Sequence, residues 1–294
     1  MTISIAHLGP SGTYAEQAAM VIADWLQQTR QQASTLHPYS SIRQTLQAAS
    51  NRQVDIAVVP VENSIEGSVT MTLDTLWQLD QLKIQWALDL PIVHALMSYA
   101  NGLEEIQTVY SHPQALAQCQ MWLEQHIPKA QLVPTSSTTE AIQHLRETPT
   151  AAAISSERAA NIYQVPILAC PINDHPDNRT RFWALSVQPS PGGNLTSLAF
   201  SVHDLPGALV KPLQVFADRA LNLSRIESRP TKRLLGDYIF FVDLEANYCQ
   251  ETVQATLEAL KPTTEILKIL GSYDLLPRPA KAQERSPNSP LLLD

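Results

Sequence analysis

The side chains best suited to chemistry gather in four short motifs. The motifs are Gly9-Pro10-Ser11-Gly12-Thr13, residues 60–69 (PVENSIEGSV), Ser111-His112-Pro113-Gln114 and Asn178-Arg179-Thr180-Arg181-Phe182. Their amide, hydroxyl, imidazole and guanidinium groups can hydrogen-bond an anionic ligand or a leaving oxygen. The sequence contains no Ser/His/Asp order, no HExxH pattern and no CxxC pair, which argues against serine hydrolases, zincins and redox enzymes.

The first motif lies between a predicted strand (3–7) and a predicted helix that runs from Tyr14 to Leu26. Backbone N–H groups and the positive end of the helix dipole can hold a carboxylate or a phosphate there. The loop is neither a Walker loop nor a GxGxxG loop, and an ordinary tight turn explains it equally well.

The second and third motifs follow predicted strands, at the ends where α/β sheets place their ligands. Capping of the next helix would explain Ser68 but not Asn63 or Ser64, which favours a binding role for these two. For His112, a helix cap or a core partner is as consistent with the sequence as a catalytic role.

The fourth motif, residues 178–182, combines three kinds of group in adjacent positions. A guanidinium can bind a carboxylate with two hydrogen bonds, the Thr180 hydroxyl can hydrogen-bond a leaving oxygen, and an aromatic ring can exclude water. A solvated basic loop is the alternative for Arg179, and the whole segment 171–182 is polar enough to predict an exposed loop. Glu140 fits a capping box with Ser137 as the N-cap slightly better than a catalytic role.

Strands and helices alternate from residue 3 to residue 163, which predicts an α/β fold with a parallel, helix-flanked sheet. Besides the elements named above, strands are predicted at 35–39, 55–61, 84–90, 92–98, 107–111, 131–135 and 151–155. Helices are predicted from a Ser40 N-cap to Arg52 and at 113–126, 138–147 and 156–163.

The composition changes at residues 188–194 (QPSPGGN), which predicts an interdomain linker. After it the sequence predicts strand 196–203, helix 208–221, strands 224–229 and 237–245 with a turn at Leu235-Gly236, helix 250–260 and strand 264–270. This β-α-β-β-α-β order is that of a ferredoxin-like domain. Residues 275–294 are rich in proline, and we predict a disordered tail there.

Composition and charge exclude several classes of function. The 294 residues include 20 Lys and Arg against 28 Asp and Glu, a net charge of −8, so a nucleic-acid-binding surface is not expected. No apolar run approaches the roughly 20 residues of a membrane span, and the N-terminal residues lack a signal-peptide pattern. The scattered Cys119, Cys170 and Cys249 predict neither a paired disulfide framework nor a metal site, so we expect a cytoplasmic protein.

In combination, these motifs resemble the prephenate dehydratase family. The matching segments are GPSGTYAE (9–16), VPVENSIEGSV (59–69), YSHPQALAQC (110–119), STTEA (137–141) and NRTRF (178–182). LPGALVKPL (205–213) and NLSRIESRP (222–230) resemble the motifs of the family's C-terminal ACT regulatory domain. The resemblance covers residues 3–273, and since no chorismate mutase segment precedes it, the chain resembles the monofunctional members.

The resemblance implies a catalytic domain over residues 1–188 that is similar to periplasmic binding proteins, with a cleft between two lobes. One lobe would comprise 1–80 and 165–187, the other 81–164, and the ACT domain would occupy 196–273. The implied reaction is the decarboxylating dehydration of prephenate to phenylpyruvate, CO2 and water in L-phenylalanine biosynthesis, with no metal or organic cofactor.

The resemblance also implies roles for single residues. Thr180 would assist the departure of the hydroxyl group, Arg181 would anchor a substrate carboxylate, and Phe182 would shape the cleft. Further hydrogen bonds to the substrate are expected from Thr13, Asn63, Ser64, His112 and Gln114, and the candidate Glu140 lies in another matching segment. Arogenate dehydratases share these motifs, and a non-catalytic amino-acid sensor is the alternative from a different class.

The ACT motifs imply a regulatory site for L-phenylalanine between paired domains of a homodimer or a homotetramer. Its residues would be Gly207, Ala208, Leu209, Val210, Asn222, Leu223, Glu227, Ser228, Arg229 and Pro230. Plain domain packing without a ligand is the alternative for these segments.

Overall fold

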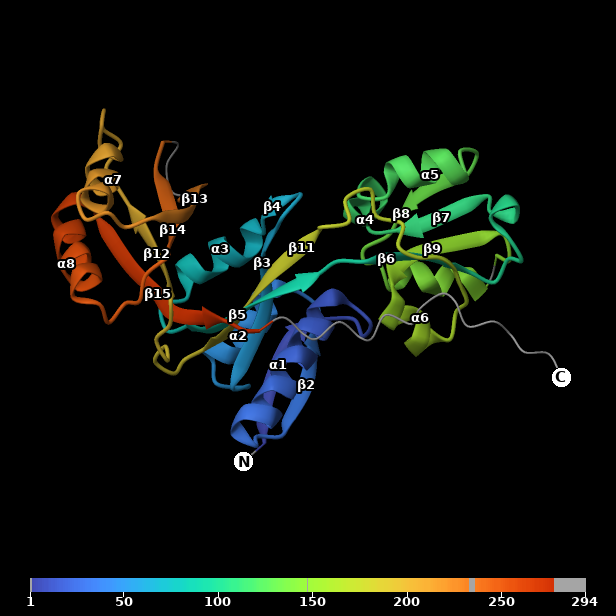
Figure 1. Ribbon diagram of the computed structural model, residues 1–294, viewed down its shortest axis with the longest axis horizontal. Helices are drawn as coiled ribbons and strands as arrows, with labels where there is room; N and C mark the ends of the chain where they lie inside the picture. The colour runs from blue at the N-terminus through green and yellow to red at the C-terminus, as the bar shows by residue number, and fades with distance from the viewer. Residues whose placement is uncertain (1, 147, 233–235, 278–294) are drawn as a thin grey trace.

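The computed structural model describes residues 2–146, 148–232 and 236–277, which form two lobes and a third unit at the C-terminal end (Figure 1). Two sheets run through these residues, one ordered β13-β14-β12-β15-β5-β11-β3-β1-β2 with the short β4 beside β3, the other ordered β10-β6-β9-β7-β8. No helix in the described ranges is both long and apolar enough to cross a membrane.

The first lobe is built on one half of the larger sheet. Its strands are β1 (Ile3–Leu8), β2 (Ser34–Tyr39), β3 (Ile56–Asn63), β4 (Gly67–Ser68), β5 (Lys83–Pro91) and β11 (Arg179–Ser186). Its helices are α1 (Tyr14–Arg30), α2 (Ile42–Ser50) and α3 (Thr70–Gln78). The N-cap of α2 is Ser41 and not the predicted Ser40, because the Ser41 hydroxyl accepts the N–H of Gln44 at 3.2 Å.

The second lobe contains the smaller sheet. Its strands are β6 (His94–Ser98), β7 (Thr108–Ser111), β8 (Gln131–Pro134), β9 (Ala151–Ser156) and β10 (Ile167–Ala169). The helices are η1 (Leu103–Glu105), α4 (Pro113–Ala117), α5 (Gln120–His126), η2 (Glu140–Arg146) and α6 (Glu157–Tyr163), of which η1 and η2 are 3-10 helices. The single helix predicted for 113–126 is therefore two, and that predicted for 138–147 is a 3-10 helix.

The chain crosses between the lobes in a way that the predicted lobe boundaries missed. Strand β5 (83–91), expected in the second lobe, pairs along its length with β11 in the sheet of the first lobe. Strand β10 (167–169), expected in the return to the first lobe, pairs with β6 of the second. Figure 1 shows β5 and β11 running side by side toward the second lobe, so these two strands are the connection between the lobes.

The prediction of an exposed loop over 171–182 is wrong for its last residues. From Arg179 onward the chain forms β11, which is paired antiparallel with β3 on one side and β5 on the other. Thr180 and Arg181 of this strand tolerate burial because they form hydrogen bonds with Asn63 of β3 and Asp89 of β5, as described below. Thr180 is 8% exposed and Phe182 is 2% exposed.

The C-terminal unit has the predicted β-α-β-β-α-β order. It comprises β12 (Leu195–Ser201), α7 (Val210–Ala217), β13 (Leu223–Pro230), β14 (Tyr238–Leu244), α8 (Glu251–Leu260), the 3-10 helix η3 (Lys261–Thr263) and β15 (Ile266–Leu275). The turn predicted at Leu235-Gly236 lies partly outside the described residues, because Leu235 is not described.

The C-terminal unit is continuous with the first lobe. The end of β15 pairs in parallel with β5, which joins the two halves of the larger sheet. One face of the C-terminal sheet packs on its own helices through Phe216 and Leu257. The other face contributes Phe241 and Tyr273 to a core that also contains Trp183 of the first lobe. The two units therefore share a hydrophobic core.

The start of the predicted tail is ordered. Leu275 ends β15, and the backbone N–H of Leu276 donates to the carbonyl of Ala87 at 2.7 Å. The Leu276 side chain packs in the same core as Trp86 and Leu88. The rest of the predicted tail, 278–294, lies outside the described residues.

We expect Leu276→Ala to destabilise the protein, because Leu276 is 5% exposed and its truncation leaves a cavity against the first lobe. The expected loss is about 2–5 kcal/mol in the free energy of unfolding measured with urea. The control is Leu275→Ala, since Leu275 is 40% exposed and its loss should be about 1 kcal/mol or less. Equal effects of the two variants would contradict the docking of Leu276.

Candidate active site

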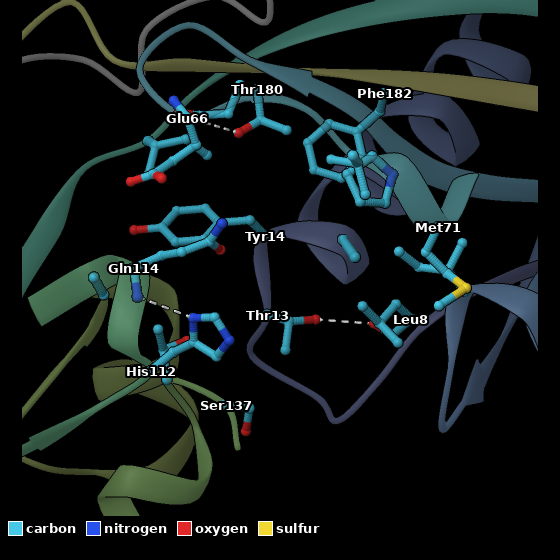
Figure 2. Close-up of a pocket in the computed structure, with 18 of the residues that line it drawn as sticks. Leu8, Thr13, Tyr14, Glu66, Met71, His112, Gln114, Ser137, Thr180 and Phe182 are labelled. Atoms are coloured by element: carbon cyan, nitrogen blue, oxygen red, sulfur yellow. Dashed lines mark hydrogen bonds between the residues drawn. The ribbon is translucent and has the colours of Figure 1, made fainter. Parts of the chain in front are cut away.

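A cavity of about 970 Å³ lies between the two lobes. Figure 2 shows part of its lining, which comes from loops at the ends of several strands and from β11 itself. The first lobe contributes residues around 8–15, 38–42 and 60–71, and the second contributes His94, residues 112–118 and residues 136–138. Loops of this kind can surround a small ligand on all sides.

Six of the nine predicted catalytic-site residues line this cavity. They are Thr13, Asn63, His112, Gln114, Thr180 and Phe182. Ser64, Arg181 and Glu140 are not among the lining residues. The cavity is also lined by residues that were not predicted individually as site residues: Tyr14, Glu66 of the second motif, His94, Gln118 and Ser136-Ser137-Thr138.

Thr180 is held by a single amide. The Nδ2 group of Asn63 donates to Thr180 Oγ1 at 2.9 Å and to Asn178 Oδ1 at 2.8 Å. A hydroxyl group that accepts a hydrogen bond keeps its own proton for donation, and Thr180 lines the cavity. The Thr180 hydroxyl is therefore able to donate a hydrogen bond to a ligand in the cavity.

Buried polar groups behind Asn63 complete this network. Asn178 donates from Nδ2 to Gln118 Oε1 at 2.9 Å, and His94 Nε2 lies 3.1 Å from the same oxygen. Burial lowers the pKa of His94, although its hydrogen bond with Gln118 opposes the shift, so the ring is neutral and Nε2 carries the donated proton. The sequence signal that could have pointed to this network is a histidine, His94, within the apolar run 92–98.

His112 lines the cavity and also caps a helix. Its Nδ1 atom accepts the backbone N–H of Gln114 at 3.3 Å, which confirms the helix-cap interpretation. Burial lowers the pKa of His112, and the negative charge of Glu66 opposes this shift. The imidazole is thus a neutral group that can still hydrogen-bond a ligand in the cavity.

Arg181 does not have the position expected for a carboxylate anchor. Its Nε and Nη2 atoms donate to the two carboxylate oxygens of Asp89 at 2.7 and 2.9 Å. Arg181 and Asp89 are opposite each other on β11 and β5, and these hydrogen bonds raise the pKa of Arg181. Because neighbouring residues of a strand point to opposite faces, Arg181 faces away from the cavity that Thr180 lines.

Ser64 and Glu140 support the site from outside the cavity. Ser64 Oγ accepts the N–H of Arg179 at 3.0 Å and thereby helps to fix the start of β11. Glu140 accepts the N–H of Ser136 at 2.8 Å while its own N–H donates to Ser137 Oγ at 3.0 Å. Ser137 accepts the N–H of Glu140 as predicted for the N-cap, but the Glu140 carboxylate accepts the N–H of Ser136 and not that of Ser137, so the capping box is only partly formed. These bonds order the loop 136–138 that lines the cavity.

The hydrogen-bond donors of the glycine loop before α1 bind a side chain of the protein itself. Gly12 N–H and the Ser11 hydroxyl donate to Glu16 at 2.7 and 2.6 Å, and Arg158 of the second lobe binds the same carboxylate at 2.8 Å. Burial would raise the pKa of Glu16, but these hydrogen bonds and the charge of Arg158 lower it. This supports the tight-turn interpretation over that of an anion site.

The charge of the cavity lining is unusual for a site that binds anions. Among the described lining residues there is no lysine or arginine, and Glu66 is the one carboxylate. Ligand carboxylates would therefore be bound by neutral donors such as hydroxyl, amide and imidazole groups. No cluster of His, Cys, Asp or Glu side chains in the described ranges is arranged to hold a metal ion.

The residues predicted for regulation lie on two parts of the C-terminal unit. Gly207, with a φ of +76°, makes the turn that leads through Ala208 and Leu209 to Val210 at the start of α7. Along β13, the half-buried Leu223, Glu227 and Arg229 alternate with the exposed Ser228 and Pro230. Asn222 precedes this strand and donates to Glu245 Oε2 at 2.9 Å.

Arg229 connects the C-terminal unit to the first lobe. Its Nε and Nη2 atoms bind the Asp74 carboxylate of α3 at 3.0 and 3.1 Å, and Lys232 Nζ binds it at 2.6 Å. Burial opposes ionisation of Asp74, but hydrogen bonds from Arg229 and Lys232 lower its pKa. The first residues of α3, Thr70 and Met71, line the cavity.

Together the fold and the site define a class: a two-lobed α/β enzyme with a hydroxyl-donating cleft, followed by a ferredoxin-like regulatory unit. The prephenate dehydratase family model matches residues 5–190, and the ACT domain model matches 196–261. The chain therefore belongs to the prephenate dehydratase family.

Individual relatives agree with this assignment. The chain is 36% identical to the prephenate dehydratase of Methanocaldococcus jannaschii, over 93% of this chain and 98% of the relative. It is 41% identical to the bifunctional chorismate mutase/prephenate dehydratase of Aquifex aeolicus, over 92% of this chain and 73% of the relative. The structure of prephenate dehydratase from Arthrobacter aurescens in complex with L-Phe superposes with a TM-score of 0.83 at 34% identity, covering 92% of this chain and 90% of that one.

We expect Arg181→Met to affect stability far more than substrate binding, because it leaves the Asp89 carboxylate without its partner. The loss in the free energy of unfolding should be about 1–3 kcal/mol, with KM for prephenate within about threefold of wild type. The double variant Arg181→Met/Asp89→Leu should recover much of the stability. A KM raised about tenfold with unchanged stability would restore Arg181 as the carboxylate anchor.

Proposed function

We propose that the cavity between the lobes binds prephenate and catalyses its conversion to phenylpyruvate, CO2 and water, the reaction of its family. The observation that carries this proposal is the Thr180 hydroxyl, which accepts from Asn63 at 2.9 Å and faces the cavity beside Phe182. In the substrate, the ring carboxylate leaves as CO2 while the ring hydroxyl departs. A hydroxyl group that donates to the departing oxygen stabilises the charge that develops on it.

Aromatisation of the ring drives this reaction, so the protein mainly has to orient the substrate and help the hydroxyl to leave. The apolar part of the lining, including Phe182, Tyr14 and Met71, suits a six-membered ring. The serine loop 136–138 and the side chains of Gln114 and His112 are neutral hydrogen-bonding groups placed to receive the two substrate carboxylates.

We further propose that L-phenylalanine regulates the enzyme through the ACT domain. The Arthrobacter relative was solved in complex with L-Phe, and the ion pairs of Arg229 and Lys232 with Asp74 give a physical route. A shift of β13 on binding the amino acid would move α3, and the first turn of α3 lines the cavity.

The cellular setting and the assembly follow as proposals from the same family. A biosynthetic enzyme of this kind, without a membrane-spanning helix in its described residues, is expected in the cytoplasm. Pairing of ACT domains predicts a homodimer or a homotetramer, which light scattering would distinguish.

The first test is turnover of prephenate by the purified protein and by Thr180→Ala. We expect kcat to fall by about 10²- to 10⁴-fold in Thr180→Ala, and Thr180→Ser to keep most of the activity because it retains the donor. Undiminished turnover by Thr180→Ala would remove the hydroxyl from the mechanism. If the wild type converts arogenate but not prephenate, arogenate is the substrate. Turnover of neither compound would favour a non-catalytic amino-acid sensor.

The second test measures inhibition by L-phenylalanine in wild type and in Asp74→Asn. Weakening the ion pairs to Arg229 should raise the concentration of L-phenylalanine needed for half inhibition by about tenfold. The matched control is Asp80→Asn, which removes another ion pair between the first lobe and the C-terminal unit, with Lys268, outside α3. Equal inhibition of all three proteins would show that α3 does not transmit the effect.

A further inference from the structure

Glu66 has the chemistry that Thr180 lacks. It lies in the turn between β3 and β4, and it is the one carboxylate among the described residues of the cavity lining. Its backbone N–H donates to Asn63 Oδ1 at 3.1 Å, so the amide that holds the Thr180 hydroxyl also holds this turn. Figure 2 shows the Glu66 side chain and the Thr180 hydroxyl in the same part of the cavity.

The carboxylate of Glu66 is held by one neutral donor. Gln118 Nε2 lies 3.4 Å from Glu66 Oε1, and no lysine or arginine is present among the described lining residues. Glu66 is otherwise exposed, so water can reach its second oxygen. Glu66 is therefore accessible both to a ligand in the cavity and to water, which can supply protons.

The reaction needs a proton because hydroxide is a poor leaving group. The threonine hydroxyl can hydrogen-bond the departing oxygen, but it is too weak an acid to give up its proton fully. The cleavage of the C–O bond therefore calls for an acid that is close to neutral pH in strength and that can be reprotonated from solvent.

The other titratable groups that face Glu66 are less suited to this role. His112 at the start of α4 is a neutral imidazole whose Nδ1 already accepts from Gln114. His94 of β6 uses its Nε2 proton on Gln118, and Tyr14 of α1 donates its hydroxyl proton to the carbonyl of Val93 at 2.6 Å. Tyr39 at the end of β2 also lines the cavity, and a phenol is a weak acid at neutral pH.

We propose that Glu66 is the general acid of the reaction: its carboxyl group gives a proton to the ring hydroxyl as the C–O bond breaks. The bond between the ring and its carboxylate breaks in the same process, and its electron pair completes the aromatic ring. CO2 and water leave, and the Glu66 carboxylate takes up a proton from solvent. Each turnover thus consumes one proton and yields one phenylpyruvate.

Prephenate carries two carboxylates, and the described lining has no lysine or arginine to neutralise their charge. Glu66 is the one carboxyl group of the described lining that can supply a proton beside such a substrate. The inference rests on the proposed reaction, which supplies the anionic substrate and the leaving hydroxyl.

The test compares the pH dependence of kcat and KM for prephenate in wild type, Glu66→Gln and Glu66→Asp. General acid catalysis predicts a wild-type rate that falls as the pH rises. Glu66→Gln should lose about 10²- to 10³-fold in kcat, keep KM within about threefold, and show a residual rate that no longer depends on pH. Glu66→Asp should retain part of both the rate and its pH dependence.

The matched control is Glu62→Gln, which removes a carboxylate four residues earlier that does not line the cavity. It should keep the wild-type rate and pH profile, and thermal unfolding of each variant checks that it is folded. A lower KM with undiminished kcat in Glu66→Gln would overturn the proposal, since it would mean that Glu66 only repels the substrate. A wild type without activity on prephenate would instead contradict the proposed function.

Discussion

The register of β11 between β3 and β5 is the constraint on which the rest of the site depends. In this register Thr180 lies opposite Asn63 on one side and Leu90 on the other, while Arg181 lies opposite Asp89. Because side chains alternate along a strand, a slip by one residue would turn Arg181 into the cavity and remove Thr180 from it. Such a slip would break the ion pair between Arg181 and Asp89. The ion pair therefore stabilises the register that places the Thr180 hydroxyl at the cavity.

Paired charges and neutral polar groups lie on different sides of the larger sheet. Formal charges are paired behind the larger sheet, where Arg181 binds Asp89 and Arg225 binds the buried Asp243 at 2.7 Å. The cavity instead presents hydroxyl, amide and imidazole groups and one carboxylate. Neutral donors stabilise a developing negative charge without holding the ionised product tightly.

The C-terminal regulatory unit shares a sheet and a hydrophobic core with the first lobe. Strand β15 extends the catalytic sheet through β5, and Tyr273 and Phe241 pack in one core with Trp183. Arg225 stacks over the Trp183 ring at 5.2 Å and Arg229 holds α3 through Asp74. These contacts connect the C-terminal unit to β11 and α3, the two elements that carry Thr180 and part of the cavity lining.

The sequence by itself determined the alternation of strands and helices up to residue 163, the ferredoxin-like unit and the family, because hydrophobic periodicity and short polar motifs are local properties. It also identified Ser137 as a cap before Glu140, and the residues Thr180 and Asn63. The tertiary structure decided which side of a strand each group faces: it turned Arg181 to Asp89, buried the segment predicted as a loop, and brought Glu66, His94 and Gln118 to the cavity. The physical reason is that strand register and lobe crossing depend on partners far apart in the chain, and only their pairing determines where a side chain points.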